Sequence, residues 1–149
     1  MRVTLKSSEI GDVYKLAASL RENDARELVG MGGDPLKIIR ANYRHGILRT
    51  SYFVDGEIAA MTGLCGGALA DEGLPYLFTT AAVEKVPISF LKEARAMVRR
   101  MLILRKTLTG YVAADYEGAM RLLTALGFDL GEREIWKTGV AFRKFTRNR

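Results

Sequence analysis

The stretch that most constrains the fold is "ILRTSYFVDGEIAAMTGL", residues 47–64. Two strand-like runs flank Asp55-Gly56, a dipeptide suited to the positive φ angles of a tight hairpin turn. The run "LPYLFTTAAV", residues 74–83, predicts another strand after the loop "CGGALADEG". We therefore expect three consecutive antiparallel strands in the middle of the chain.

Helical patterns lie on both sides of these strands. A first strand, "RVTLKSS", precedes a helix for which Ser7 or Ser8 is the expected N-cap. Further helices are predicted at about residues 23–30, 34–46, 89–105 and 117–126. The run "LTGYVAA" predicts a fifth strand, and "REIWKTGVAFRKF" predicts a final hairpin around Thr138-Gly139. This order predicts one α+β domain over residues 1–149.

Composition excludes several kinds of site. The chain has 149 residues, 48% hydrophobic and 27% charged, and no apolar run approaches the ~20 residues that span a bilayer. We therefore expect no membrane contact, and the polar N-terminus favours cytosolic synthesis. One cysteine, Cys65, and one histidine, His45, exclude an internal disulfide and a Cys/His zinc site, so no metal is expected.

The net charge of +6 permits contact with nucleic acid. Basic residues gather on one face of the long helix and in the tail "FRKFTRNR". No nucleic-acid motif is present, so such contact would be weak, non-specific and sensitive to salt.

Arg21, Asp24 and Glu27 recur three residues apart, so on a helix they form one charged stripe. The stripe is either a solvated face or an ion-pair patch for a partner protein or a sheet edge. The sequence leaves both open.

The segment "AMRLLTALGF" after the fifth strand resembles the Gcn5-related N-acetyltransferase (GNAT) superfamily, with Ala119 and Gly127-Phe128 on the family's alanine and Gly-Phe. The resemblance implies a mixed, mostly antiparallel central sheet with helices on both faces.

Four further stretches, "LRENDAREL", "YLFTT", "FLKEARAMVRRM" and "GVAFRKF", resemble the internal virion protein of T7-like bacteriophages and related prophage proteins, a divergent branch of that fold. This implies virion assembly through contacts with phage structural or assembly proteins, in the host cytoplasm or the virion, without acetyltransferase activity.

The superfamily binds the acetyl-CoA pyrophosphate on a glycine-rich turn between the fourth strand and the long helix. Here that turn is "VEKVPISFL", with no glycine between Gly73 and Gly110, and Pro87 removes one N–H donor. We therefore expect no cofactor. The alternative is an acetyl-CoA-dependent N-acetyltransferase with a divergent turn, in which the cofactor would contact Ala82, Val83, Lys85, Ser89 and Tyr116.

The resemblance also implies a tyrosine acid in the helix before Gly-Phe, but Leu123 holds that position and Tyr116 holds the family's asparagine position. Tyr116 and Tyr111 are weak substitutes as acid. For a general base, Glu57, Asp71 and Glu72 are candidates by residue type alone. The test that separates the alternatives is whether the N–H groups of residues 84 to 90 converge on a cleft between strands four and five.

Overall fold

The computed structural model describes residues 1–67 and 69–149. The strands are β1 (Val3–Ser7), β2 (Gly46–Val54), β3 (Glu57–Gly66), β4 (Glu72–Thr79), β5 (Thr107–Ala113), β6 (Asp129–Ile135) and β7 (Ala141–Asn148). The helices are α1 (Ile10–Ala18), α2 (Glu22–Gly30), α3 (Pro35–His45), the 3₁₀ helix η1 (Ala81–Lys85), α4 (Pro87–Leu104) and α5 (Glu117–Ala125).

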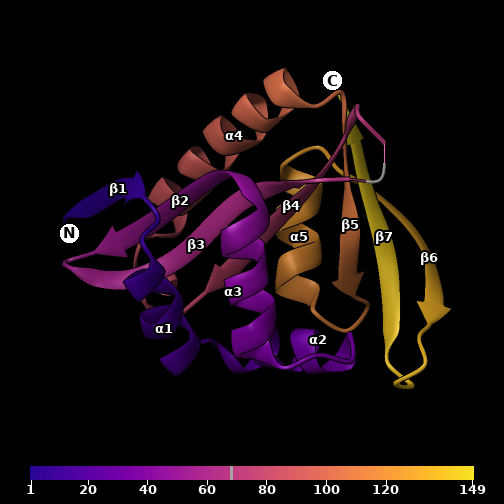
Figure 1. The fold of residues 1–149 in the computed structure, drawn as a ribbon, viewed down its shortest axis with the longest axis horizontal. Coiled ribbons are helices and arrows are strands. Elements are labelled where there is room, and N and C mark those ends of the chain that lie inside the picture. Colours follow the sequence, from indigo (N-terminus) through magenta and orange to yellow (C-terminus); the bar gives the residue numbers. More distant parts are fainter. Residues whose placement is uncertain (68) are drawn as a thin grey trace.

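The seven strands form one sheet in the order β1-β2-β3-β4-β5-β7-β6. Among the described strands, only β4 and β5 are parallel neighbours, and α4 is the crossover that joins them. These two strands pair only at their starts, Glu72 with Thr107 and Gly73 with Leu108, and then diverge (Figure 1). The sheet is therefore split along its middle, and we call the widening gap between β4 and β5 the splay.

Helices cover both faces of the sheet, as expected. On one face, side chains of α1, α2 and α3, such as Val13, Leu28 and Ile39, pack against β2, β3 and β4. On the other face, α4 and α5 pack against β3, β5 and β7. Figure 1 shows α1 and α3 in front of the left half of the sheet, whereas no described helix lies in front of β7 and β6.

The predicted hairpin between β2 and β3 is confirmed. Asp55 and Gly56 have φ angles of 49° and 81°, and Val54 pairs with Glu57 across the turn. The final hairpin is also present, with Gly139 at a φ of 83°. Its first strand is longer than expected, because β6 begins at Asp129 and not at Arg133.

Two expectations about element ends were wrong. Ser7 and Ser8 do not cap α1; the N-cap is Glu9, whose N–H donates to Asp12 Oδ2 at 2.9 Å, while the Ser8 hydroxyl bonds that of Ser51. The fourth strand ends at Thr79 instead of continuing to Val83. Residues 81–85 form η1 because the Thr80 hydroxyl caps the amide of Ala82, so that Ala82 and Val83 enter a buried cluster with Phe90.

The predicted loop at residues 65–73 is shorter than expected, since β3 reaches Gly66 and β4 begins at Glu72. Ala68, within that loop, lies outside the described residues. None of the described helices is both long enough and apolar enough to span a bilayer.

Candidate active site

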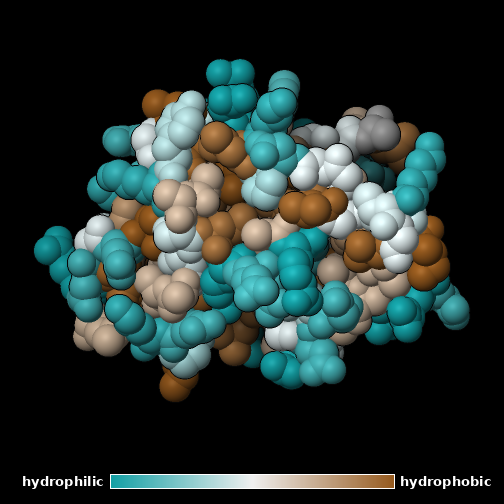
Figure 2. All heavy atoms as spheres, turned by 90° about the horizontal axis from the view of Figure 1, so that it is seen from below, coloured by the Kyte–Doolittle hydropathy of each residue, from teal (hydrophilic) through white to brown (hydrophobic). Residues whose placement is uncertain are grey.

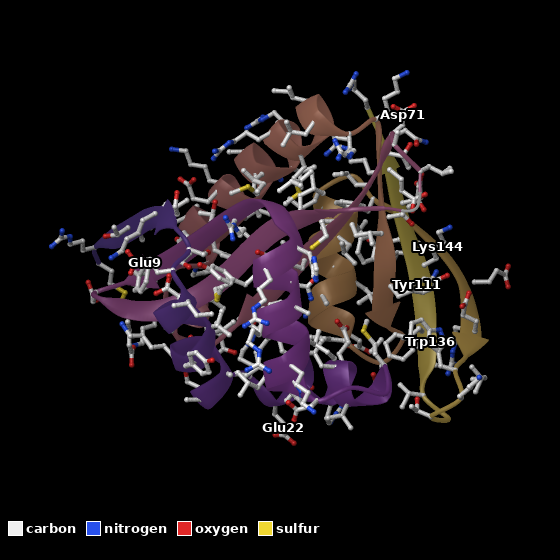
Figure 3. The ribbon with its side chains drawn as sticks, viewed as in Figure 1. Glu9, Glu22, Asp71, Tyr111, Trp136 and Lys144 are labelled. Atoms are coloured by element: carbon white, nitrogen blue, oxygen red, sulfur yellow. The ribbon has the colours of Figure 1, made fainter. Side chains whose placement is uncertain are left out.

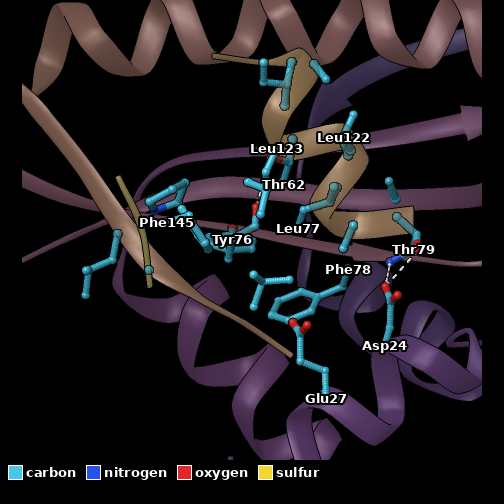
Figure 4. Close-up of a pocket in the computed structure, with 18 of the residues that line it drawn as sticks. Asp24, Glu27, Thr62, Tyr76, Leu77, Phe78, Thr79, Leu122, Leu123 and Phe145 are labelled. Atoms are coloured by element: carbon cyan, nitrogen blue, oxygen red, sulfur yellow. Dashed lines mark hydrogen bonds between the residues drawn. The ribbon is translucent and has the colours of Figure 1, made fainter. Parts of the chain in front are cut away.

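A cavity of about 670 Å³ occupies the splay. Its walls come from α2, β4, β5, α4 and α5, and apolar side chains dominate, including Phe78, Met97, Leu122 and Leu123. Figure 4 shows Leu122 and Leu123 entering from the α5 side and the carboxylates of Asp24 and Glu27 from the α2 side. Where β4 and β5 diverge, the backbone N–H and C=O groups on their facing edges have no neighbouring strand as a hydrogen-bond partner.

Asp24 lies at the wide end of the splay and is buried. Its Oδ2 accepts hydrogen bonds from the Thr79 amide at 2.7 Å and from the Thr79 hydroxyl at 2.8 Å. The Thr80 amide donates to Ala59 of β3, so by strand alternation the Thr79 amide points away from β3 and into the splay. Asp24 therefore caps a strand-edge donor of β4.

Glu27 makes the equivalent contact with β5. Its Oε2 accepts from the amide of Ala113 at 3.0 Å. Burial, opposed by this hydrogen bond and reinforced by the nearby charges of Asp24 and Asp115, raises the pKa of Glu27 from 4.5 to about 7. With this pKa, the Glu27 carboxyl group exchanges a proton near neutral pH. No described residue bonds its Oε1, so one oxygen is free for a ligand.

Arg21 and Tyr116 complete this corner. The Arg21 guanidinium donates from Nε to the Thr79 hydroxyl at 2.7 Å and from Nη2 to the Tyr116 hydroxyl at 2.9 Å, and it pairs with Glu84 at 3.2 Å. The Tyr116 hydroxyl in turn donates to Asp24 Oδ1. Burial and this bond to Asp24 raise the pKa of Tyr116 above its ordinary range, so the hydroxyl keeps its proton.

The stripe of Arg21, Asp24 and Glu27 is therefore not a solvated face. It packs against the edges of β4 and β5 in the splay. Of the two alternatives that the sequence left open, the patch that binds a sheet edge is the one observed.

The predicted acid candidates both line the cavity. Tyr116 is the N-cap of α5, and Tyr111 lies in β5, where its ring meets Trp136 at a centroid distance of 5.0 Å. Leu123 also lines the cavity and offers no proton.

The predicted base candidates lie apart from this corner. Glu57 is exposed at the start of β3 and pairs with Lys85 at 3.8 Å, and Asp71 pairs with Lys106 at 3.9 Å. Glu72 lines the cavity at its narrow end, where β4 and β5 pair.

The turn between β4 and α4 offers little to a pyrophosphate. The amides of Val86 and Phe90 donate to the carbonyls of Val83 and Val86, and Pro87 has no N–H. Ser89 accepts a hydrogen bond from Tyr52 at 3.0 Å through its hydroxyl. Among residues 80 to 90 only Phe90 lines the cavity, and its amide bonds the Val86 carbonyl, so the amides of this turn do not converge on the cavity. The cavity is large enough for the thioester arm of such a cofactor, whereas the turn offers few donors to its phosphates.

Several arginines of the basic tail are engaged in the fold. Arg143 donates to the carbonyl of Gly131 at 2.7 Å, Arg147 to that of Leu126 at 2.6 Å, and Arg149 to that of Leu102 at 2.6 Å. The last two close the C-terminal ends of α5 and α4.

Comparison with known proteins shows similarity in structure alone. No known family and no curated protein matches the sequence. Among solved structures, a GNAT-family acetyltransferase from Bacillus anthracis superposes with a TM-score of 0.73 at 7% identity, covering 99% of this chain and 95% of that one. The chain has the GNAT fold.

Two further structures with the GNAT fold match over most of both chains. The ribosomal-protein-S18-alanine N-acetyltransferase from Escherichia coli gives a TM-score of 0.67 at 15% identity, covering 99% of this chain and 94% of that one. The acetyltransferase AAC(6')-Ib, in complex with ribostamycin and coenzyme A, gives 0.70 at 14% identity, covering 100% and 94%. Nothing in these comparisons supports the expected relation to phage internal virion proteins or a part in virion assembly.

Glu27, and Thr79 beside Asp24, were missed as site residues by reasoning from sequence. One signal was available: Asp24 precedes Leu28 by four residues, so the two share a face of α2, and Leu28 is that helix's main core side chain. A carboxylate on a core-facing stripe needs a buried partner.

Proposed function

We propose that the protein is an N-acyltransferase that transfers an acyl group from a coenzyme A-type thioester to a primary amine. The observation that supports this most directly is Glu27, a carboxyl group with a pKa of about 7 and a free oxygen in the cavity of the splay. A base that titrates near the working pH removes a proton from an ammonium group effectively.

The thioester would supply the acyl carbon that the amine attacks. Leu122, Leu123 and Met97 would contact the methylene groups of its pantetheine arm between α4 and α5. Coenzyme A is present in one of the GNAT-fold structures similar to this chain, which supports a donor of this class.

Glu27 takes the first proton of the acceptor ammonium at Oε1. The second proton goes to the leaving sulfur, once the C–N bond has formed and the C–S bond has broken. Asp24 and Tyr116 are positioning residues, because their polar atoms already bond Thr79, Arg21 and each other. They hold α2 against β4 and so fix where Glu27 points.

The experiment is a thiol-release assay with acetyl-CoA and a panel of primary amines. Glu27→Gln should lower kcat/KM by about 10²–10⁴, the usual contribution of a general base. Glu57→Gln is the matched control, since Glu57 is exposed and outside the cavity; it should stay within about twofold of wild type.

In the wild type, kcat/KM should rise with pH and level off above about pH 7, as Glu27 ionises. Absence of thiol release with every amine, from protein shown to be folded, would contradict the proposal. So would an equal loss of activity in Glu57→Gln.

A further inference from the structure

The cavity extends beyond Glu27 along β5 and β7. Tyr111, Trp136 and Lys144 line this part, and Figure 3 shows the three labelled side chains in a row over β5 and β7, on the face that no described helix covers. Tyr111 and Lys144 are register partners in the β5–β7 pair. The three residues therefore form one continuous wall, which we call the β5–β7 wall.

The middle of the β5–β7 wall is aromatic. Trp136 meets Tyr111 at 5.0 Å and lies against Phe142 at 4.3 Å, tilted by 36°. Phe142 is fully buried and supports the indole from behind, while Tyr111 and Trp136 remain partly exposed toward the cavity. Rigid, partly exposed rings of this kind bind flat apolar groups.

The two ends of this region have opposite charge. Glu27 bonds the amide of Ala113, and Lys144 lies beside Tyr111, two residues earlier in β5 and so about 7 Å along the strand. The Lys144 ammonium is exposed and pairs with no acidic group among the described residues. A ligand that follows β5 meets a carboxylate, then aromatic rings, then a cation.

The hydroxyl of Thr109 is a buried polar group in this part of the cavity. Thr109 is 6% exposed, lines the cavity, and has a hydroxyl with no hydrogen-bond partner among the described residues. By strand alternation its side chain shares a face of β5 with that of Tyr111. A buried hydroxyl of this kind is costly to leave unpaired, which indicates a ligand or a water that bonds it.

We propose that the acceptor is a small primary amine that also carries an anionic group, with a flat apolar body between the two. Its ammonium lies at Glu27, its apolar body against Tyr111 and Trp136, and its anionic group at Lys144. This inference rests on the proposed function and narrows it from amines in general to this class.

The test compares three amines of one shape: 4-(aminomethyl)benzoate, benzylamine and p-xylylenediamine, whose far ends are anionic, neutral and cationic. Trp136 is the only tryptophan of the chain, so its fluorescence reports binding without any donor. The wild type should bind the anionic amine about fivefold more tightly than benzylamine, and p-xylylenediamine least tightly. The same order should appear in 1/KM.

Lys144→Glu should reverse this order, because the wall then carries a negative charge. Lys92→Glu is the matched control: it makes the same change on an exposed lysine of α4 that lies outside the cavity and pairs with no acidic group in the part of the chain that the structure describes, and it should keep the wild-type order. Equal binding of the three amines, or an unchanged order in Lys144→Glu, would overturn the inference. Acylation of all three at similar rates would also overturn it and leave the proposed function intact. The predicted binding order without any acylation would support the ligand class and contradict the function.

Discussion

At the scale of single residues, Asp24 and Glu27 lie about one helical turn apart on α2 but have different surroundings. Asp24 accepts from both the amide and the hydroxyl of Thr79 and from the hydroxyl of Tyr116. Glu27 accepts from one amide only, so burial dominates its pKa. The first carboxylate is structural, and the second is free to exchange a proton.

The raised pKa of Glu27 links stability to pH. Its pKa is about 7 in the folded chain against 4.5 ordinarily, so the folded state binds the proton more tightly. The tighter proton binding therefore stabilises the folded state fully below about pH 4.5, and this stabilisation is lost as the pH rises through 7. Between pH 5 and 8 we expect the Tm of wild type to fall by about 5–10 °C relative to that of Glu27→Gln, which stays neutral.

Differential scanning fluorimetry across that pH range measures the difference, with Glu57→Gln as the control for general charge effects. Parallel Tm curves for wild type and Glu27→Gln would show that Glu27 titrates normally in the folded chain.

Removal of the Asp24 carboxylate should destabilise the fold. Asp24→Ala leaves the buried amide and hydroxyl of Thr79 without their acceptor, and we expect a loss of about 1–3 kcal/mol in the free energy of unfolding. Arg26→Ala, which removes an exposed ion pair with Asp115, should cost less than about 0.5 kcal/mol. Urea unfolding measures the free energy of unfolding of both variants. Equal losses in the two would contradict the expectation that the buried Asp24 stabilises the fold more than the exposed ion pair.

At the scale of elements, the turn formed by η1 and the start of α4 is where this chain departs from the expected phosphate site. Because Pro87 has no N–H and the amides of Val86 and Phe90 bond carbonyls of the same turn, few donors remain for the phosphates of coenzyme A, which should add little to binding. We expect the KM of S-acetyl-pantetheine to lie within about tenfold of that of acetyl-CoA, whereas even two charged hydrogen bonds to phosphate would give a difference of about a hundredfold or more.

Steady-state kinetics with both donors measures the ratio, and inhibition by 3′-phospho-ADP gives an independent check. Strong inhibition by this nucleotide would reveal a phosphate site that the turn does not show.

Most elements were predictable, because their signals are local. Asp55-Gly56 specifies its own turn, and the helix that starts at Asp34-Pro35 carries its own cap, with Asp34 accepting from the amide of Lys37. The end of β4 was not predictable from "TTAAV", since Ala82 and Val83 leave the strand to pack against Phe90, which is an interaction between segments. The site was largely hidden for the same reason: Glu27 meets Ala113 across 86 positions of sequence.

At the scale of the whole molecule, α2 bridges the two halves of a divided sheet. β4 and β5 are joined by strand pairing only at Glu72 and Gly73, and at the other end by Asp24 and Glu27. The double variant Asp24→Ala/Glu27→Ala should therefore loosen the wide end alone. In hydrogen exchange followed by NMR, the amides of Thr79 and Ala113 should exchange at least about tenfold faster, while that of Leu108 stays protected. Uniform acceleration of all three would indicate global destabilisation instead.

The parallel contact between β4 and β5 has a kinetic consequence. The hairpins β2–β3 and β6–β7 close short loops, whereas Glu72 must find Thr107 after α4 has crossed behind the sheet, and Glu27 must find Ala113 across an even longer stretch of chain. Contacts between distant segments cost more loop entropy and form late. We expect the two halves of the sheet to fold first as separate units, so that the cavity is the last part of the molecule to assemble.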